Sequence, residues 1–337
     1  MHTTASPSPA AASPPRPGQP VVEIRNLTKR FGGFTALDDL SLSLDRGQIL
    51  GFIGPNGAGK TTTIKILVGI MRPTSGSARI AGADCVSDAR RIKRLVGYMP
   101  DTFGGYDAMR VREYLDFFGA AFGIRARDRR RRVDEVLETT ATTSYKDRFV
   151  ESLSHGMKQR VGVARTLLHD PEVLILDEPA NGLDPQARID MRELLLRLAQ
   201  MGKTLIVTSH ILPELARICD VVAIITQGKL RAFGGLDRIM REIRQSRTFE
   251  VQLCDPAHVE AAGGVVRRRL PETERAAVGL HPAEALVRFD TGSDDATLAA
   301  LLAELVAAGV PIAQFREVPK DLEDAFLSVT AATGSAS

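Results

Sequence analysis

The sequence has few cysteines, no tryptophan and almost no imbalance of charge. Its three cysteines, Cys85, Cys219 and Cys254, are scattered and form no C-x-x-C pair, a pattern that fits neither a disulfide framework nor a cysteine-built zinc site. The 337 residues carry a formal net charge of only +3, so no global field points to nucleic acid or to an acidic partner. The composition therefore predicts a globular protein of about two domains in a reducing, cytoplasmic compartment.

A membrane span and a signal peptide are also missing from the sequence. A spanning helix needs roughly 20 consecutive apolar residues, and the closest run, residues 298–315, contains Glu304, Gly309 and Pro311. Residues 1–20 are rich in Pro, Ala and Ser and lack a basic start followed by an apolar stretch, so we interpret them as a disordered leader. We expect any work at a membrane to depend on recruitment by a partner.

Hydrophobic periodicity divides the remaining chain into two predicted domains. In residues 21–235, short apolar strands alternate with helical patterns, which predicts an α/β sheet covered by helices. Residues 236–247 are interpreted as a basic helical linker, residues 248–330 as a small α+β domain, and residues 331–337 as a disordered tail. The elements expected in the small domain are strands 248–253, 285–290 and 312–318 and helices 297–308 and 321–329.

A glycine-rich segment, GPNGAGKT at residues 54–61, has the spacing of a phosphate-binding loop. Glycines let backbone N–H groups turn toward phosphates, and the helix that follows adds the positive end of its dipole. In this pattern Lys60 reaches the β- and γ-phosphates, Thr61 ligates Mg²⁺, and we expect Thr62 to add a hydroxyl at the α-phosphate. The nucleotide-binding residues predicted here are Gly54, Pro55, Asn56, Gly57, Ala58, Gly59, Lys60, Thr61 and Thr62.

Two adjacent carboxylates follow an apolar run, residues 173–176, that predicts a buried strand. The strand runs into Asp177 and Glu178, which places both at the carboxyl edge of the sheet, where open α/β sheets hold ligands. We expect Asp177 to hold Mg²⁺ through its water shell and Glu178 to orient and deprotonate an attacking water. No N-K-x-D guanine motif accompanies them, which disfavours a GTPase.

Together with the segment LSHGMKQR at residues 153–160, which lies between them, these motifs resemble the ATP-binding cassette (ABC) ATPases, the motor subunits of ABC transporters, over about residues 21–235. This segment is similar to the family's LSGGQ signature and retains Ser154 and Gly156. His155 stands where a Gly is usual, and Met157 where a Gln is usual. The resemblance implies that the Ser154 hydroxyl and the Gly156 backbone face the γ-phosphate bound by another protomer.

Four further positions take their expected roles from this resemblance. Asp184, in NGLD, looks like part of the loop that runs along the dimer interface, and His210 looks like the switch histidine that contacts the γ-phosphate. Phe31 sits where an aromatic ring stacks on adenine. Asp101 occupies the position of a usual Gln, from which a carboxylate can still reach Mg²⁺ through water.

The resemblance implies a fold class and a function. The expected fold is an α/β P-loop NTPase of the ABC ATPase type, a mixed β-sheet with a helical subdomain, followed by a small α+β C-terminal domain. The expected function is ATP hydrolysis with ATP and Mg²⁺ as cofactors, coupled to head-to-tail closure of two cassettes, as a homodimer or a heterodimer. The chain is expected on the inner face of the cell membrane, held there by a separate multi-span permease. Its C-terminal DLEDAFLSVT resembles ATPases of multidrug and antibiotic-resistance exporters, which favours export.

Two other classes of function stay open. A soluble ABC ATPase acting on nucleic acid or ribosomes generally carries two cassettes, a long coiled coil or zinc-binding cysteines, and this sequence shows none of these. A regulatory module that holds ATP without turnover is disfavoured by the presence of Glu178 and His210. The arginine run at residues 125–132 is interpreted as a solvated helix face, so no nucleic acid is expected.

Four aromatic side chains share one predicted helical face, and two interpretations of this face stay open. The four side chains form the core of a helical subdomain, or some of them line a groove for a permease helix together with Phe103 and Tyr106. The members of the face are Tyr114, Phe117, Phe118 and Phe122.

Overall fold

Three β-sheets organise the chain in the computed structural model. It describes residues 20–101, 108–209, 217–235, 247–272 and 278–318, together with Leu215, Ile239, Glu274 and Arg275. The predicted leader, the predicted helix 321–329, the tail and most of the linker lie outside the described residues. Within the ranges that are described, no helix has both the length and the apolar content needed to cross a membrane.

The central sheet has six strands in the order β10-β9-β3-β8-β7-β6. Five of them run parallel and β10 returns antiparallel to β9. Side chains alternate between the two faces: in β3, for example, Ile49 and Ile53 enter one core while Leu50 and Phe52 enter the other. The strands are β3 (Ile49–Ile53), β6 (Val96–Met99), β7 (Val173–Leu176), β8 (Thr204–Ser209), β9 (Val221–Thr226) and β10 (Lys229–Gly235).

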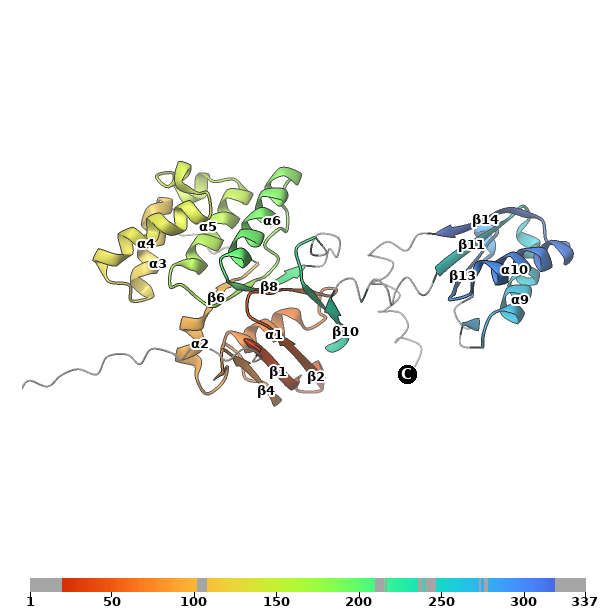
Figure 1. The fold of residues 1–337 in the computed structure, drawn as a ribbon, viewed down its shortest axis with the longest axis horizontal. Helices are drawn as coiled ribbons and strands as arrows, with labels where there is room; N and C mark the ends of the chain where they lie inside the picture. Colours follow the sequence, from red (N-terminus) through yellow and green to blue (C-terminus); the bar gives the residue numbers. More distant parts are fainter. Residues whose placement is uncertain are drawn as a thin grey trace, which may run out of the picture.

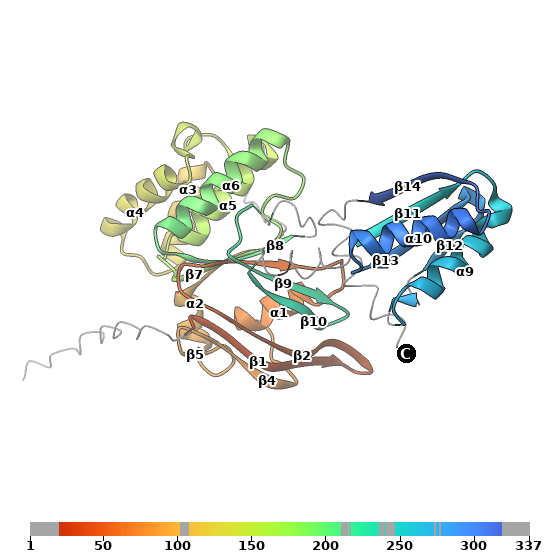
Figure 2. The ribbon, with the colours of Figure 1, turned by 45° about the vertical axis from the view of Figure 1, so that its right-hand side comes forward.

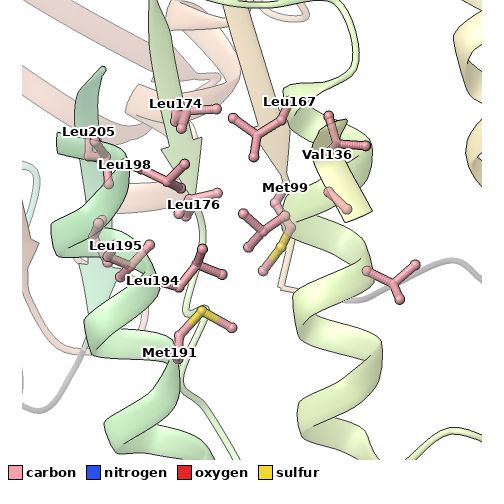
Figure 3. Packing of buried hydrophobic residues seen from close by; sticks show 14 of the residues in the cluster. Met99, Val136, Leu167, Leu174, Leu176, Met191, Leu194, Leu195, Leu198 and Leu205 are labelled. Carbon is pink, nitrogen blue, oxygen red and sulfur yellow. The ribbon is translucent and has the colours of Figure 1, made fainter. Parts of the chain in front are cut away.

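Helices cover one face of this sheet (Figure 1). Leu194 and Leu198 of α6 and Leu167 of α5 pack with Met99 and Leu174 of the sheet in one apolar core, and Figure 3 shows this packing. Burial of both strand faces explains why these strands are continuous apolar runs in the sequence. The helices on this face are α3 (Val111–Ala121), α4 (Ala126–Thr139), α5 (His155–Leu167) and α6 (Pro185–Gln200), with short turns η1 (Thr143–Tyr145) and η2 (Val150–Ser152).

A second, antiparallel sheet covers the other face (Figure 2). It has the order β2-β1-β4-β5, and helix α1 packs in the same core between the two sheets. Helix α1 ends at Leu67, because Gly69 turns the chain with φ of 72°. The elements are β1 (Val22–Phe31), β2 (Phe34–Leu44), β4 (Ser75–Ile80), β5 (Ala83–Asp84), α1 (Lys60–Leu67) and α2 (Ala89–Leu95).

The third sheet belongs to the C-terminal part and has the order β12-β13-β11-β14. Strands and helices alternate as βαββαβ, which is the split βαβ arrangement of ferredoxin-like folds. Its core is built from residues between Phe249 and Phe315. The elements are β11 (Arg247–Leu253), η3 (Pro256–His258), α9 (Val259–Arg269), β12 (Gly279–His281), η5 (Pro282–Glu284), β13 (Leu286–Thr291), α10 (Asp295–Ala307) and β14 (Ile312–Val318).

The aromatic face expected on one helix is divided between interior and surface. Tyr114 is fully buried and its ring lies 4.8 Å from that of the half-buried Phe118, whereas Phe117 and Phe122 are each 42% exposed. Phe122 stacks on the ring of His169 at 4.2 Å. Phe103 and Tyr106 lie outside the described residues. The core interpretation therefore fits Tyr114 and Phe118 and does not fit Phe117 and Phe122.

The arginine run is less solvated than expected. Arg129 forms an ion pair with Asp116, with Nε 2.7 Å from Oδ1. Arg132 donates hydrogen bonds to the backbone oxygens of Leu167 and Leu168 at the end of α5. These two arginines hold helices of the subdomain together, because a guanidinium presents several donors in a fixed fork.

Candidate nucleotide site

Three loops meet at the carboxyl edge of the central parallel sheet. Residues 54–59 follow β3, Asp101 follows β6, and Asp177 and Glu178 follow β7, because parallel strands all end at the same edge. They surround a cavity of about 410 Å³. Its described lining is Phe31, Phe34, Ala36, Pro55, Asn56, Gly57, Ala58, Gly59, Lys60, Thr61, Thr62, Asp101, Asp177, Glu178 and Asn181.

The loop before α1 needs its glycines for both conformation and space. Gly57 and Gly59 have φ of 82° and 111°, in the left-handed region that favours glycine. A Cβ on Gly59 would lie 2.9 Å from the Ala36 backbone oxygen, and one on Gly54 would lie 2.4 Å from that of Ile225. The loop is therefore pressed against its neighbours and leaves its other side to the cavity, although Gly54 itself is outside the described lining.

Lys60, the first residue of α1, has a nearly buried ammonium group directly after the loop. Its Nζ donates to the backbone oxygens of Gly54 at 2.5 Å and Pro55 at 3.3 Å, and lies 4.0 Å from Oε1 of Glu178. Burial lowers the pKa of Lys60, while Glu178 and Asp177 act in the opposite direction. A cation in this shielded position attracts a phosphate more strongly than it would in water.

Asp177 is a buried carboxylate, 5% exposed, that accepts a hydrogen bond of 2.6 Å from the Thr208 hydroxyl. Burial raises its pKa; the bond from Thr208 counters this, and the charges of Asp101 and Glu178 raise it further. In the described part of the chain, no three His, Cys, Asp or Glu side chains gather as a metal site. The oxygens of Asp177, Asp101 and Thr61 line one cavity and fit Mg²⁺, which proteins hold through one or two carboxylates plus phosphate oxygens.

Glu178 begins a turn with unusual backbone geometry. Its φ is 52°, which is uncommon for a residue with a side chain and stores strain. Its N–H donates to the Thr208 hydroxyl at 2.8 Å, so one hydroxyl fixes both acidic residues. Thr208 was not among the residues predicted from the sequence; the available signal was its place at the end of the apolar strand β8, which pairs with β7.

Two aromatic side chains also line the cavity. Phe31 and Phe34 pair at the tip of the β1–β2 hairpin and are 47% and 63% exposed. The Lys29 ammonium lies 4.9 Å from the centre of the Phe31 ring. Phe31 was predicted as the residue that stacks on the base, whereas Phe34 was missed because nothing in its local pattern distinguishes it from a core aromatic.

Besides Gly54, three predicted site residues lie outside the described lining of this cavity: Ser154, Gly156 and Asp184. The Ser154 side chain caps helix α5 by accepting from the Met157 N–H at 3.3 Å, and Asp184 caps α6 by accepting from the Ala187 N–H at 2.9 Å. A Cβ on Gly156 would lie 3.0 Å from the Ala187 Cβ, so the two helix starts are packed together. His210 is not among the described residues.

Comparisons with known proteins agree with this geometry. The family model described as "ABC transporter" matches residues 37–181. The Nod factor export ATP-binding protein I of Ralstonia nicotianae is 36% identical over 324 residues, 94% of this chain and 97% of that protein. The linearmycin resistance ATP-binding protein of Bacillus subtilis is 30% identical over 313 residues, 93% and 99% of the two chains. A solved ATP-binding subunit of an ABC transporter, 31% identical, superposes with a TM-score of 0.60 over 66% of this chain and 93% of that one.

Proposed function

The chain belongs to the ABC transporter family of ATP-binding proteins, and we propose that it drives an exporter by hydrolysing ATP beside a separate membrane permease. The expected fold class, an ABC ATPase cassette with a small C-terminal α+β domain, and the expected enzyme class, an ATPase, are confirmed. The observation that carries the proposal is the meeting of a phosphate loop, two strand-end carboxylates and an aromatic hairpin tip in one cavity.

The residues around this cavity have distinct proposed roles. The loop N–H groups and Lys60 hold the phosphates, with the ammonium at the β- and γ-phosphates. Glu178 accepts a proton from water as the water oxygen attacks the γ-phosphorus, and ADP leaves with its β-phosphate oxygen. Thr61, Asp177 and Asp101 would hold Mg²⁺, which would neutralise part of the phosphate charge.

A second chain would complete the site. Ser154, Gly156 and Asp184 sit at the exposed starts of two helices, outside their own chain's cavity. The family resemblance supports a head-to-tail pair in which Ser154 of one protomer faces the nucleotide held by Lys60 of the other. His210 is proposed to contact the γ-phosphate. The pair is a homodimer or a heterodimer, and reopening after hydrolysis would move the permease between its inward and outward states.

Export is supported by two relatives that align along nearly the whole chain. One is named for Nod factor export and the other for linearmycin resistance, and their alignments span 94% and 93% of this chain. We therefore propose that the chain lies on the inner face of the cell membrane, where a multi-span permease holds it.

ATP-dependent dimerisation tests the site and its completion by a second chain. With Glu178→Gln, ATP and Mg²⁺ should give a stable dimer in size-exclusion chromatography with light scattering, because closure can occur while proton removal from water cannot. The same variant in ADP is the control, and adding Ser154→Ala should weaken the dimer. A Glu178→Gln protein that stays monomeric in ATP and hydrolyses it at the wild-type rate would contradict the assignment of the base.

The permease partner needs a separate experiment. Tagged wild-type protein should retain a multi-span membrane protein from detergent-solubilised membranes, identified by mass spectrometry, and ATP hydrolysis by the purified pair should respond to the transported compound. Recovery of ribosomes or repair proteins, with no membrane protein, would instead favour the soluble class of ABC ATPases.

A further inference from the structure

His155 makes a specific contact with the loop that follows Glu178. Its Nε2 lies 2.9 Å from the backbone oxygen of Asn181. A carbonyl oxygen can only accept, so Nε2 carries the hydrogen and donates it. The two residues are 26 positions apart in the sequence, and the bond joins the start of α5 to the segment between β7 and α6.

The imidazole ring also covers the residue after Asn181. Gly182 has φ of 68°, and a Cβ built on it would lie 3.5 Å and 3.6 Å from Nε2 and Cδ2 of His155. The ring therefore lies on the side of Gly182 from which a side chain would project, at ordinary van der Waals distance from that Cβ position. The hydrogen bond to Asn181 and the ring beside Gly182 both act on this loop.

The loop held by His155 reaches the nucleotide cavity. The Asn181 N–H donates to the Glu178 backbone oxygen at 3.1 Å, closing the turn that begins at Glu178. Asn181 and Glu178 both line the cavity. A continuous series of short contacts thus runs from His155 through Asn181 to the proposed catalytic base.

Further contacts hold helices α5 and α6 against one another. Gly156 lies against Ala187 in the close approach described above, and Arg160 forms an ion pair with Asp190, with Nη2 2.7 Å from Oδ2. These two contacts fix the helices but do not reach the turn at Glu178. His155 supplies that missing connection.

We propose that His155 is a positioning residue that joins residues 154–156 to residues 181–184, so that the two segments move as one unit. This rests on the proposed function, in which residues 154–156 face the partner's nucleotide while the other segment adjoins the chain's own Glu178. Arrival of the partner at the first segment is then transmitted directly to the turn that orients the base.

Three substitutions separate the donor from the ring. His155→Phe keeps a ring over Gly182 and removes the donor, His155→Gln keeps an N–H donor at similar reach, and His155→Gly removes both. His281→Phe, the same change at an exposed histidine of the C-terminal sheet, is the matched control.

Hydrogen–deuterium exchange of the full chain without nucleotide measures the contact itself. Amides of residues 178–187 should exchange about three- to tenfold faster in His155→Phe and His155→Gly, as expected for loss of one hydrogen bond. His155→Gln should remain near the wild-type rate, and His281→Phe should not change this segment. Equal protection of the segment in wild type and His155→Phe would overturn the proposal.

Steady-state kinetics tests the consequence for hydrolysis. His155→Phe should lower kcat about three- to tenfold with KM for ATP within about twofold, and His155→Gln should restore kcat. A loss of kcat in His155→Phe that His155→Gln does not restore would also count against positioning by the donor. If the wild-type chain hydrolyses no ATP, the proposed function fails while the exchange experiment still decides the role of His155.

Discussion

Two buried carboxylates, Asp177 in the cassette and Glu250 in the C-terminal sheet, have opposite electrostatic surroundings. Asp177 is 5% exposed and Glu250 is 4% exposed. Asp177 shares its cavity with two other acids and with Lys60, and burial raises its pKa. Burial would also raise the pKa of Glu250, but hydrogen bonds from Arg288 and Arg316 outweigh it and hold the pKa below the ordinary value.

The strand register explains the surroundings of Glu250. It lies in β11 directly opposite Arg288 of β13 and Arg316 of β14. Arg316 donates from Nε at 3.0 Å and from Nη2 at 2.6 Å, and Arg288 donates from Nε at 2.9 Å and from Nη2. Such charge-assisted pairs satisfy the carboxylate within its own domain.

The difference distinguishes Glu250, whose charge is compensated within its own domain, from Asp177, which we propose helps to hold Mg²⁺. Glu250 has its counter-charges in the chain itself. Asp177 lies beside two acids, so its ionised form is best compensated when a cation and nucleotide bind. A site kept under-compensated lowers stability in favour of function.

The largest expected effect concerns hydrolysis at the cassette. Glu178→Gln should lower kcat for ATP at least about 100-fold, since general-base catalysis typically contributes 10²–10⁴-fold. Glu250→Gln, the same change in the other region, should stay within about twofold of wild type. Phosphate release measured at saturating ATP compares them, and equal losses would remove the distinction between the two regions.

Glu250→Gln should instead destabilise the C-terminal sheet. Two arginines lose their shared carboxylate, and because both are about half exposed we expect a loss of about 1–2 kcal/mol in the free energy of opening. Amide exchange of residues 247–253 measures it in the full chain. Since the folded pKa of Glu250 is depressed, its contribution is present above its unfolded pKa and is lost as the pH falls through the folded value. The difference between variant and wild type should therefore shrink below about pH 4.

Asp177→Asn should stabilise the folded protein, whereas Glu250→Gln destabilises it. An amide can still accept from Thr208 and no longer carries the buried charge, so the variant should unfold at a higher temperature. Each kcal/mol recovered raises Tm by about 2–4 °C for a domain of this size. A raised folded pKa makes proton binding stabilising at low pH, and that stability is lost as the pH rises through the folded pKa. The advantage of Asp177→Asn at pH 8 should vanish near pH 4; an advantage independent of pH would refute this account.

Arg316→Ala should have the smallest effect. Its side chain is 57% exposed and Arg288 remains bonded to Glu250, so we expect a loss under about 1 kcal/mol. The loss should diminish in 1 M salt, where exposed charges are screened. Amide exchange of β11 at low and high salt measures the loss of stability and its salt dependence. A loss larger than that of Glu250→Gln would contradict the view that Arg288 and Arg316 both hold Glu250 and that either can do so alone.

Local patterns account for what the sequence predicted well. The continuous apolar run at residues 173–176 predicted β7, because a strand buried on both faces carries no polar alternation. Helix α9 was missed because its Gly263 and Gly264 lower helix propensity. A Cβ on Gly263 would lie 2.4 Å from Cδ2 of Leu280, so this glycine serves close packing against β12, which no local pattern reveals.

The sequence by itself determined the phosphate loop, the strand-end acids and the family, because each depends on residues that are neighbours in the chain. The tertiary structure decided which distant groups complete them. Thr208 meets Asp177 across 31 positions because β8 lies beside β7, and His155 meets Asn181 because α5 and α6 start together. Such contacts follow from strand order and helix packing, which are set by burial of the whole chain and leave no spacing to read in the sequence.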